Sequence, residues 1–311
     1  MAKLSAHQLL ADLGLSEQPH IESEFAFKAP PHFIDLIEAN NPQDPLLKQI
    51  LPTPEEKHSP EHFSTDPVGD FQKNPQPALI HKYHGRVLLI ASPKCDIHCR
   101  YCFRRHFPYE QHANQRHWQE AFKTIAQDTT LHEVILSGGD PMSLSESALL
   151  KLSQQIEQIP HIQTLRIHSR TPIVAPDRAA QGPWLDWIQQ TRLNIVLVVH
   201  CNHAQELSPM SAALLNDYRK SGVTLLNQSV LLKGINNDVA TLEALSHALF
   251  QQGILPYYLH QLDRVAGASH FEVPESSARQ IHEQLRRKLP GYLVPKLVQE
   301  ISGEPYKTTL A

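Results

Sequence analysis

The sequence predicts an α/β fold, an incomplete (β/α)6 TIM-like barrel with an N-terminal helical extension. Six apolar, β-branched runs follow residue 85, and amphipathic stretches with apolar residues three or four apart lie between them. Such alternation is typical of a parallel sheet with helical crossovers. A doubly wound open sheet is the structural alternative, because periodicity does not separate the two arrangements.

The first part of the chain differs from the rest in its proline content. Prolines recur throughout residues 1–80, and short helical patterns such as FIDLIEAN and PLLKQIL lie between them. Because proline ends or interrupts helices, these patterns predict short helices joined by irregular chain. We interpret residues 1–80 as an extension that wraps or covers the main body.

The barrel itself is expected over residues 81–289. The predicted strands cover residues 86–92, 133–139, 164–169, 194–200, 224–232 and 256–262, and the predicted helices cover 118–127, 147–159, 211–222, 239–253 and 276–289. The strands read as nearly continuous apolar runs, as expected for strands buried on both faces. Ligands in such folds bind at the carboxyl ends of the strands.

Composition excludes several classes of protein. Of 311 residues, 41% are hydrophobic, which is enough for a packed core, and the formal net charge of −4 leaves no basic excess for binding nucleic acid. No run of about 18 apolar residues and no signal-peptide pattern is present, so we expect a cytoplasmic protein that binds no membrane.

Three of the four cysteines, Cys95, Cys99 and Cys102, lie within eight positions after the first barrel strand. Their C-x3-C-x2-C spacing lets three thiolates bind three irons of a [4Fe–4S] cluster and leaves the fourth iron open for another ligand. A structural zinc ion is the alternative, but it prefers four protein ligands, and Cys201 is distant in the sequence. Fortuitous spacing is the remaining alternative. The pattern favours the cluster.

The segment CDIHCRYC resembles the signature of the radical S-adenosylmethionine (SAM) superfamily, whose members bind SAM at the open iron. The turn SGGDP, residues 137–141, stands where that superfamily receives the methionine part of SAM. The resemblance therefore implies that Gly138, Gly139 and Asp140 bind this cofactor. It also implies SAM contacts for His200 and Gln228 at two strand ends, although each could equally be a structural polar residue.

Further segments resemble the lysine 2,3-aminomutase family, from about residue 80 to the C-terminus: CRYCFRRHF, SGGDPM, LNQSVLLKGIN, PYYLHQLD and GYLVPKLVQE. This family uses pyridoxal 5′-phosphate (PLP) beside SAM. Lys307, in a C-terminal segment over residues 290–311, stands at the lysine that binds PLP, although only Gly303 remains of the family's glycine run. Lys82 and Arg86, just before the first strand, stand at the phosphate-binding positions, and Lys82 replaces the usual arginine.

The same resemblance assigns the substrate contacts. Arg104 corresponds to the residue that pairs with the substrate carboxylate, a role suited to the guanidinium fork, although it could instead balance the charge of the cluster. Asp263 and Glu300 correspond to the acids that bind the ε-ammonium group, and Glu300 stands where relatives carry Asp. Two acids there favour a cationic amino acid over an anionic one.

The implied activity is that of an isomerase, an intramolecular aminotransferase that converts L-α-lysine to β-lysine. The alternatives are an aminomutase for another cationic amino acid and a non-catalytic iron–sulfur protein. The short length and the ending ISGEPYKTTLA resemble the family members that supply β-lysine for modifying elongation factor P. That resemblance implies a reducing partner such as flavodoxin or ferredoxin and an elongation factor P ligase that uses the product. The resemblance assigns neither a product stereochemistry nor an oligomeric state.

Overall fold

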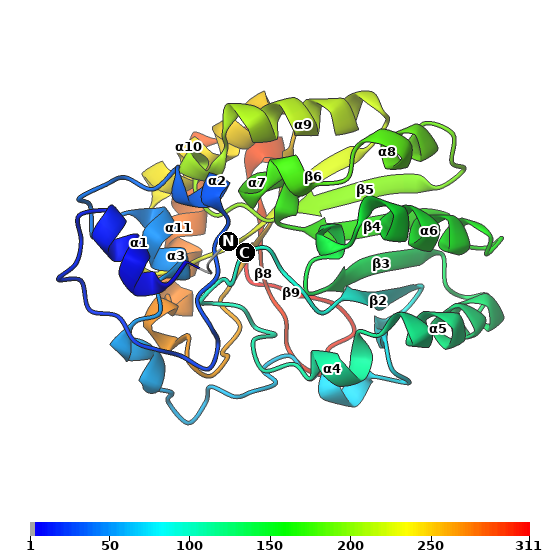
Figure 1. Ribbon diagram of the computed structural model, residues 1–311, viewed down its shortest axis with the longest axis horizontal. Coiled ribbons are helices and arrows are strands. Elements are labelled where there is room, and N and C mark those ends of the chain that lie inside the picture. Colours follow the sequence, from blue (N-terminus) through cyan, green and yellow to red (C-terminus); the bar gives the residue numbers. More distant parts are fainter. Residues whose placement is uncertain (1–3) are drawn as a thin grey trace.

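A computed structural model describes residues 4–311 (Figure 1). The strands are β1 (Leu79–Tyr83), β2 (Arg86–Ser92), β3 (Glu133–Gly138), β4 (Thr164–Ser169), β5 (Asn194–Val199), β6 (Thr224–Val230), β7 (Leu255–His260), β8 (Lys296–Gln299) and β9 (Thr308–Thr309). The helices are α1 (Ala6–Asp12), α2 (Pro31–Ile34), α3 (Pro45–Ile50), α4 (Tyr109–His112), α5 (Gln115–Gln127), α6 (Glu146–Glu157), α7 (Thr171–Val174), α8 (Gly182–Ile188), α9 (Pro209–Lys220), α10 (Val239–Gln251) and α11 (Glu275–Lys288). Short 3-10 helices η1 to η7 cover Pro54–Lys57, Phe71–Lys73, Pro141–Ser143, Pro176–Arg178, Ala204–Glu206, Ser269–Phe271 and Gly291–Leu293.

Within the described residues, the strands form one 9-stranded sheet whose order follows the chain from β1 to β9. Every neighbouring pair from β2 to β8 is parallel, while β1 and β9 add antiparallel edges. A doubly wound sheet reverses its strand order at a switch point, and no such reversal occurs along this sheet. The sheet is therefore of the barrel type, as the first alternative predicted.

The sheet curves around a cavity. Side chains from most of the barrel strands line that cavity, among them Leu88, Ile135, His168, Gln228 and His260 from β2, β3, β4, β6 and β7. The larger helices, α5, α6, α8, α9, α10 and α11, lie outside the arc of strands (Figure 1). The predicted partial barrel is thus confirmed, with its ligand-binding space on the inside of the curved sheet.

The predicted strands correspond to β2 to β7, and the predicted helices to α5, α6, α9, α10 and α11. The sequence predicted six parallel strands. The structure has one more, because β8 also pairs in parallel with β7. The sequence did not predict β1, β9, α8 or the short helices α1, α4 and α7. These elements are short, so they carry too few residues to show a clear period. Lys82 lies within β1 and not before the first strand, and Arg86 is the first residue of β2.

The N-terminal extension packs against the barrel through apolar side chains. Leu9 and Leu10 of α1, Phe33 of α2 and Leu46 and Ile50 of α3 belong to the same buried cluster as the barrel core. Its helices lie together at one side of the barrel (Figure 1). The division into parts at residues 80 and 289 stays a prediction. None of the helices in the described range combines the length and apolar character that crossing a membrane requires.

Candidate functional site

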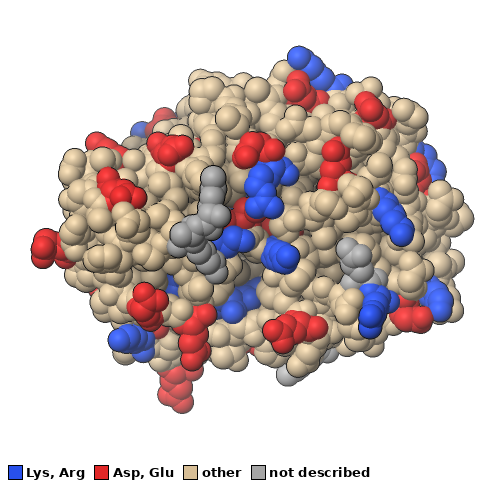
Figure 2. Space-filling model, viewed as in Figure 1, with Lys and Arg blue, Asp and Glu red and all other residues tan. Residues whose placement is uncertain are grey.

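Every residue that the sequence analysis assigned to a cofactor or to the substrate lines one cavity of about 640 Å³. The residues are Cys95, Cys99, Cys102, Gly138, Gly139, Asp140, His200, Gln228, Lys82, Arg86, Lys307, Arg104, Asp263 and Glu300. They come from segments that lie far apart in the chain. Figure 2 shows Lys and Arg side chains gathered near the centre of one face of the molecule. Clustered cations of this kind attract anionic groups.

The cysteine loop follows β2 and is held in place by the N-terminal extension. Lys28 donates a hydrogen bond to the carbonyl of Cys95, and the backbone N–H of Arg100 donates to the carbonyl of Gln49 over 2.9 Å. The buried Arg100 side chain pairs with the buried Glu56, with its Nε 2.7 Å from Oε1. Contacts between the extension and this loop therefore fix where the cysteines lie.

The three thiols of the loop are free and partly buried. Burial raises the pKa of Cys95 well above its usual value, and burial with the neighbouring Cys99 raises the pKa of Cys102 to about 11. A coordinating metal removes such protons outright. Among residues 4–311, no three His, Cys, Asp or Glu side chains are grouped to share a single ion. A cluster gives each thiolate an iron of its own, and the donor set fits that arrangement.

The glycine turn after β3 packs directly on the start of the cysteine loop. Gly139 N–H donates to Ser92 O, and Asp140 N–H donates to Lys94 O, each over 2.7 Å. A Cβ atom on Gly139 would lie 2.4 Å from the carbonyl oxygen of Lys94, and Gly138 has a φ of +117°. Only glycine allows this approach between the two loops.

Asp140 has a satisfied carboxylate. It accepts hydrogen bonds from Ser169 Oγ at 2.6 Å and from the backbone N–H groups of Arg170, Thr171 and Met142 at 2.7, 3.0 and 2.9 Å. These bonds tie the end of β3 to the start of α7. The carboxylate therefore fixes the glycine turn against the start of α7. A direct contact between Asp140 and a cofactor stays a prediction.

A chain of alternating charges crosses the cavity. Lys307 pairs with Glu300, whose other oxygen is 2.8 Å from Lys82 Nζ. Lys82 Nζ also lies 2.5 Å from Asp70 Oδ1, and Asp70 Oδ2 accepts from Arg104 Nε at 2.7 Å. Asp70, from the N-terminal extension, was not predicted from the sequence. Four of the predicted PLP-binding and substrate-binding residues thus form one ionic network with Asp70: Lys307, Lys82, Glu300 and Arg104.

The acids of this network are held in their charged form. Burial alone raises the pKa of Glu300, but Lys307 and Lys82 outweigh it and hold that pKa well below its usual value. Burial acts in the same way on Asp70, whose pKa is held low by Arg104 and Lys82. Both carboxylates therefore stay ionised and fix the orientation of the surrounding cations.

Asp263, just beyond β7, has no such partner. Its Oδ1 atom is buried without a hydrogen bond. Burial, with the like charge of Glu300, raises the pKa of Asp263 to about 7. A buried carboxylate of this kind is suited to a cationic ligand that supplies the missing charge.

Two arginines on barrel strands, Arg86 in β2 and Arg166 in β4, line the cavity. The guanidinium of Arg86 stacks 4.7 Å from the centre of the Tyr83 ring. Arg166, in β4, pairs with Glu133 at 2.8 Å and keeps a buried Nε without a hydrogen-bond partner. Arg166 was not predicted from the sequence, although a basic residue in the middle of the apolar segment TLRIHS is a usable signal.

The histidines of the cavity are held neutral. Burial, with Arg170 nearby, lowers the pKa of His200, whose Nε2 lies 2.8 Å from the Tyr101 hydroxyl. Burial also lowers the pKa of His168, and it lowers that of His260 to about 3. His168 and His260 were not predicted. Both come from strand positions whose inward direction depends on the curvature of the sheet.

Comparison with known proteins gives three kinds of match: a family model, relatives in sequence and a solved structure. Residues 84–170 match the family model of a 4Fe-4S single cluster domain. The L-lysine 2,3-aminomutase of Escherichia coli (strain K12) is 49% identical over 92% of this chain and 83% of that protein. The protein of the same name from Haemophilus influenzae is 47% identical over 92% of this chain and 85% of its own length. Among solved structures, a radical SAM methyltransferase from Sphaerobacter thermophilus matches with a TM-score of 0.47 and 15% identity, over 71% of this chain and 68% of that chain.

Proposed function

We propose, since the chain belongs to the L-lysine 2,3-aminomutase family, that it converts L-lysine to β-lysine by moving the amino group from C2 to C3. The observation that carries the proposal is the gathering of the three free cysteines, Lys307 and Asp263 around one cavity. When bound, the iron–sulfur cluster and SAM supply radical chemistry, and PLP supplies a conjugated ring that delocalises an unpaired electron. The protein supplies binding, orientation and shielding from water.

The geometry supports a set of residues that would hold these groups. Cys95, Cys99 and Cys102 are the proposed cluster ligands, and the backbone of Gly138 and Gly139 is the proposed SAM-binding surface beside them. Lys307 is the proposed PLP lysine. Its ammonium is oriented by Glu300, which is in turn fixed by Lys82. Arg86 and Lys82 offer cations to the PLP phosphate.

The two ends of the substrate meet opposite charges. Arg104 is buried and has Nε on Asp70 and Nη1 on Ser137, which holds the guanidinium in a fixed plane facing the cavity. We propose that it binds the lysine carboxylate. Asp263, with its unpartnered oxygen, is the proposed partner of the ε-ammonium. An anionic side chain would meet like charge at Asp263, so the site favours cationic amino acids.

The proposal extends to the use of the product and to the electron source. The resemblance of the segment ISGEPYKTTLA supports β-lysine as the product supplied for modification of elongation factor P. Reduction of the proposed cluster takes one electron, and we propose a flavodoxin or ferredoxin as its donor. Incubating this protein with L-lysine, elongation factor P and its ligase tests the first point, because modified factor should form only when this protein is active.

The activity test uses protein reconstituted with iron and sulfide under anaerobic conditions. We expect reduced protein with SAM, PLP and isotope-labelled L-lysine to yield β-lysine, detected by mass spectrometry. A parallel reaction with labelled L-arginine shows whether the protein also acts on another cationic amino acid. Absence of β-lysine from protein that holds a full cluster and cleaves SAM would refute the proposed function.

Replacing the proposed PLP lysine tests its assignment. Lys307→Ala should reduce β-lysine formation by about 10³-fold or more, because the covalent attachment point of PLP is lost. The exposed Lys296 in β8 supplies the matched control, since Lys296→Ala removes an amine outside the cavity. Full activity of Lys307→Ala would rule out the assignment.

A further inference from the structure

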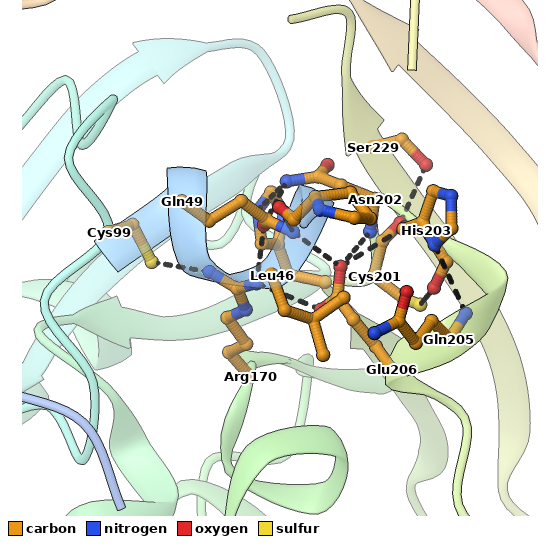
Figure 3. A network of polar contacts seen from close by, with 12 residues as sticks. Leu46, Gln49, Cys99, Arg170, Cys201, Asn202, His203, Gln205, Glu206 and Ser229 are labelled. Atoms are coloured by element: carbon orange, nitrogen blue, oxygen red, sulfur yellow. Dashed lines mark hydrogen bonds and ion pairs between the residues drawn. The ribbon is translucent and has the colours of Figure 1, made fainter. Parts of the chain in front are cut away.

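A buried arginine lies directly behind one of the cluster cysteines. Arg170 follows β4 at the start of α7 and is 6% exposed. Its Nη1 donates hydrogen bonds to Cys99 Sγ and to the Tyr101 hydroxyl, each over 2.7 Å. Figure 3 shows this side chain reaching from α7 to the cysteine on one side and to Gln49 of the N-terminal helix α3 on the other.

The charge of Arg170 is locked in place. Its Nη2 donates to Gln49 Oε1 at 2.7 Å and to the buried Glu206 carboxylate at 2.8 Å. Glu206 is itself fixed, because it accepts from Asn202 N–H at 2.9 Å and from Gln49 Nε2 at 3.1 Å. The backbone N–H of Arg170 is held by Asp140. The guanidinium therefore cannot turn away from Cys99 without breaking a buried network.

We propose that Arg170 sets the reduction potential of the iron–sulfur cluster through its hydrogen bond to the Cys99 ligand sulfur. The inference rests on the proposed cluster site and adds a residue that the resemblance did not assign. On reduction, the cluster takes one electron from a one-electron donor and no atom is transferred. The added negative charge lies beside a fixed cation in a region of low dielectric constant. Hydrogen bonds and charges around cluster sulfurs are known determinants of potential.

The sign of the effect follows from charge. A nearby cation stabilises the more negative, reduced cluster more than the oxidised one, so it makes reduction easier. Glu206 opposes part of that effect. Removing the guanidinium should therefore shift the midpoint to a more negative potential, and removing the Glu206 charge should shift it to a less negative one.

The test is an anaerobic redox titration followed by electron paramagnetic resonance, with dithionite as the reductant and with no PLP or lysine present. For Arg170→Gln, we expect the ratio of reduced to oxidised cluster at a fixed potential to fall at least tenfold, which is about 59 mV for a one-electron couple. Arg170→Lys retains a charge but loses the fork, so its shift should be smaller.

Arg178→Gln is the matched control. Arg178 pairs with Asp96, next to a cluster cysteine, but its side chain is 54% exposed. Water screens an exposed charge, so this variant should keep the wild-type midpoint. An equal shift in both variants would show a general charge effect and overturn the specific role of Arg170.

Iron and acid-labile sulfide contents separate tuning from structure. An Arg170→Gln variant with a full cluster and an unchanged midpoint would overturn the proposal. If that variant fails to hold a cluster, Glu206→Gln provides the test, because it keeps Arg170 and removes only the opposing charge. Its cluster should have a less negative midpoint potential than the wild type. An unchanged midpoint in Glu206→Gln would contradict the proposal. If the midpoint shifts in Arg170→Gln but the wild-type protein makes no β-lysine, the proposed function fails and the proposed role of Arg170 stands.

Discussion

The carboxylate of Asp263 shows how a single binding residue can oppose folding. Its Oδ1 is buried without a partner, and its pKa rises to about 7 from about 3.9 in an unfolded chain. Between these two pH values, the Asp263 carboxyl group is protonated in the folded protein but ionised in the unfolded chain, so the free energy of unfolding falls as the pH rises. The contribution of Asp263 to stability is fully present below pH 4 and is lost as the pH rises through 7. A residue with this behaviour is better suited to binding a cation than to stabilising the ligand-free fold.

Asp263→Asn should therefore stabilise the ligand-free protein at pH 8 by about 1–3 kcal/mol, after allowance for partial solvent access. The gain should shrink toward zero as the pH approaches 4, as measured by denaturant unfolding at several pH values. The exposed Asp217 offers a control, since Asp217→Asn should show no such trend. The same Asp263 variant should bind lysine more weakly. Equal stability of wild type and variant at pH 8 would contradict this account of Asp263.

Asp70 is the second residue with a specific consequence. It is 1% exposed and holds both Arg104 and Lys82. Asp70→Asn should raise the KM for lysine by about tenfold with a smaller change in kcat, because the proposed carboxylate-binding arginine loses its anchor. Steady-state kinetics over a range of lysine concentrations measures both constants. A fall in kcat at constant KM would assign Asp70 to a different step.

At the scale of elements, the cysteine loop depends on the N-terminal extension for its position. Glu56, at 8% exposure, pairs with both Arg100 and Arg105 of the loop. The extension also supplies Gln49, which contacts Tyr101 and Arg170. The N-terminal extension, which contains only short helices, thus holds the cysteine loop in position. This explains why the extension joins the core of the barrel and does not lie loosely on its surface.

Glu56→Gln tests that dependence. Removing the carboxylate leaves two buried guanidinium groups short of a counter-charge, which should cost about 3–5 kcal/mol of unfolding free energy. We also expect less iron per chain after reconstitution. Glu61→Gln makes the same chemical change at an exposed position of the extension and should leave both quantities unchanged. Normal stability and iron content in the Glu56 variant would show that the loop holds itself.

For the molecule as a whole, the sequence predicted the elements with a strong period and the residues within recognisable motifs. The barrel strands and the long outer helices lie in the expected order, and every site residue predicted within CRYCFRRHF, SGGDP and HQLD lines the cavity. Asp70 and Arg170 could not be found in this way. Asp70 lies in an extension without periodicity, and its role depends on ion pairs across 12 and 34 sequence positions. Arg170 is assigned through its hydrogen bond to Cys99, and Gln49 and Glu206 hold it there through packing between distant segments.

The most direct test of this account is the iron and acid-labile sulfide content of anaerobically prepared protein, with electron paramagnetic resonance of the reduced form. We predict about four irons and about four sulfides per chain, and a reduced-cluster signal that changes when SAM is added. The triple variant Cys95→Ser, Cys99→Ser and Cys102→Ser should lose the iron, the sulfide and the signal. Protein that binds neither iron nor sulfide, or that keeps its cluster without these cysteines, would contradict the account.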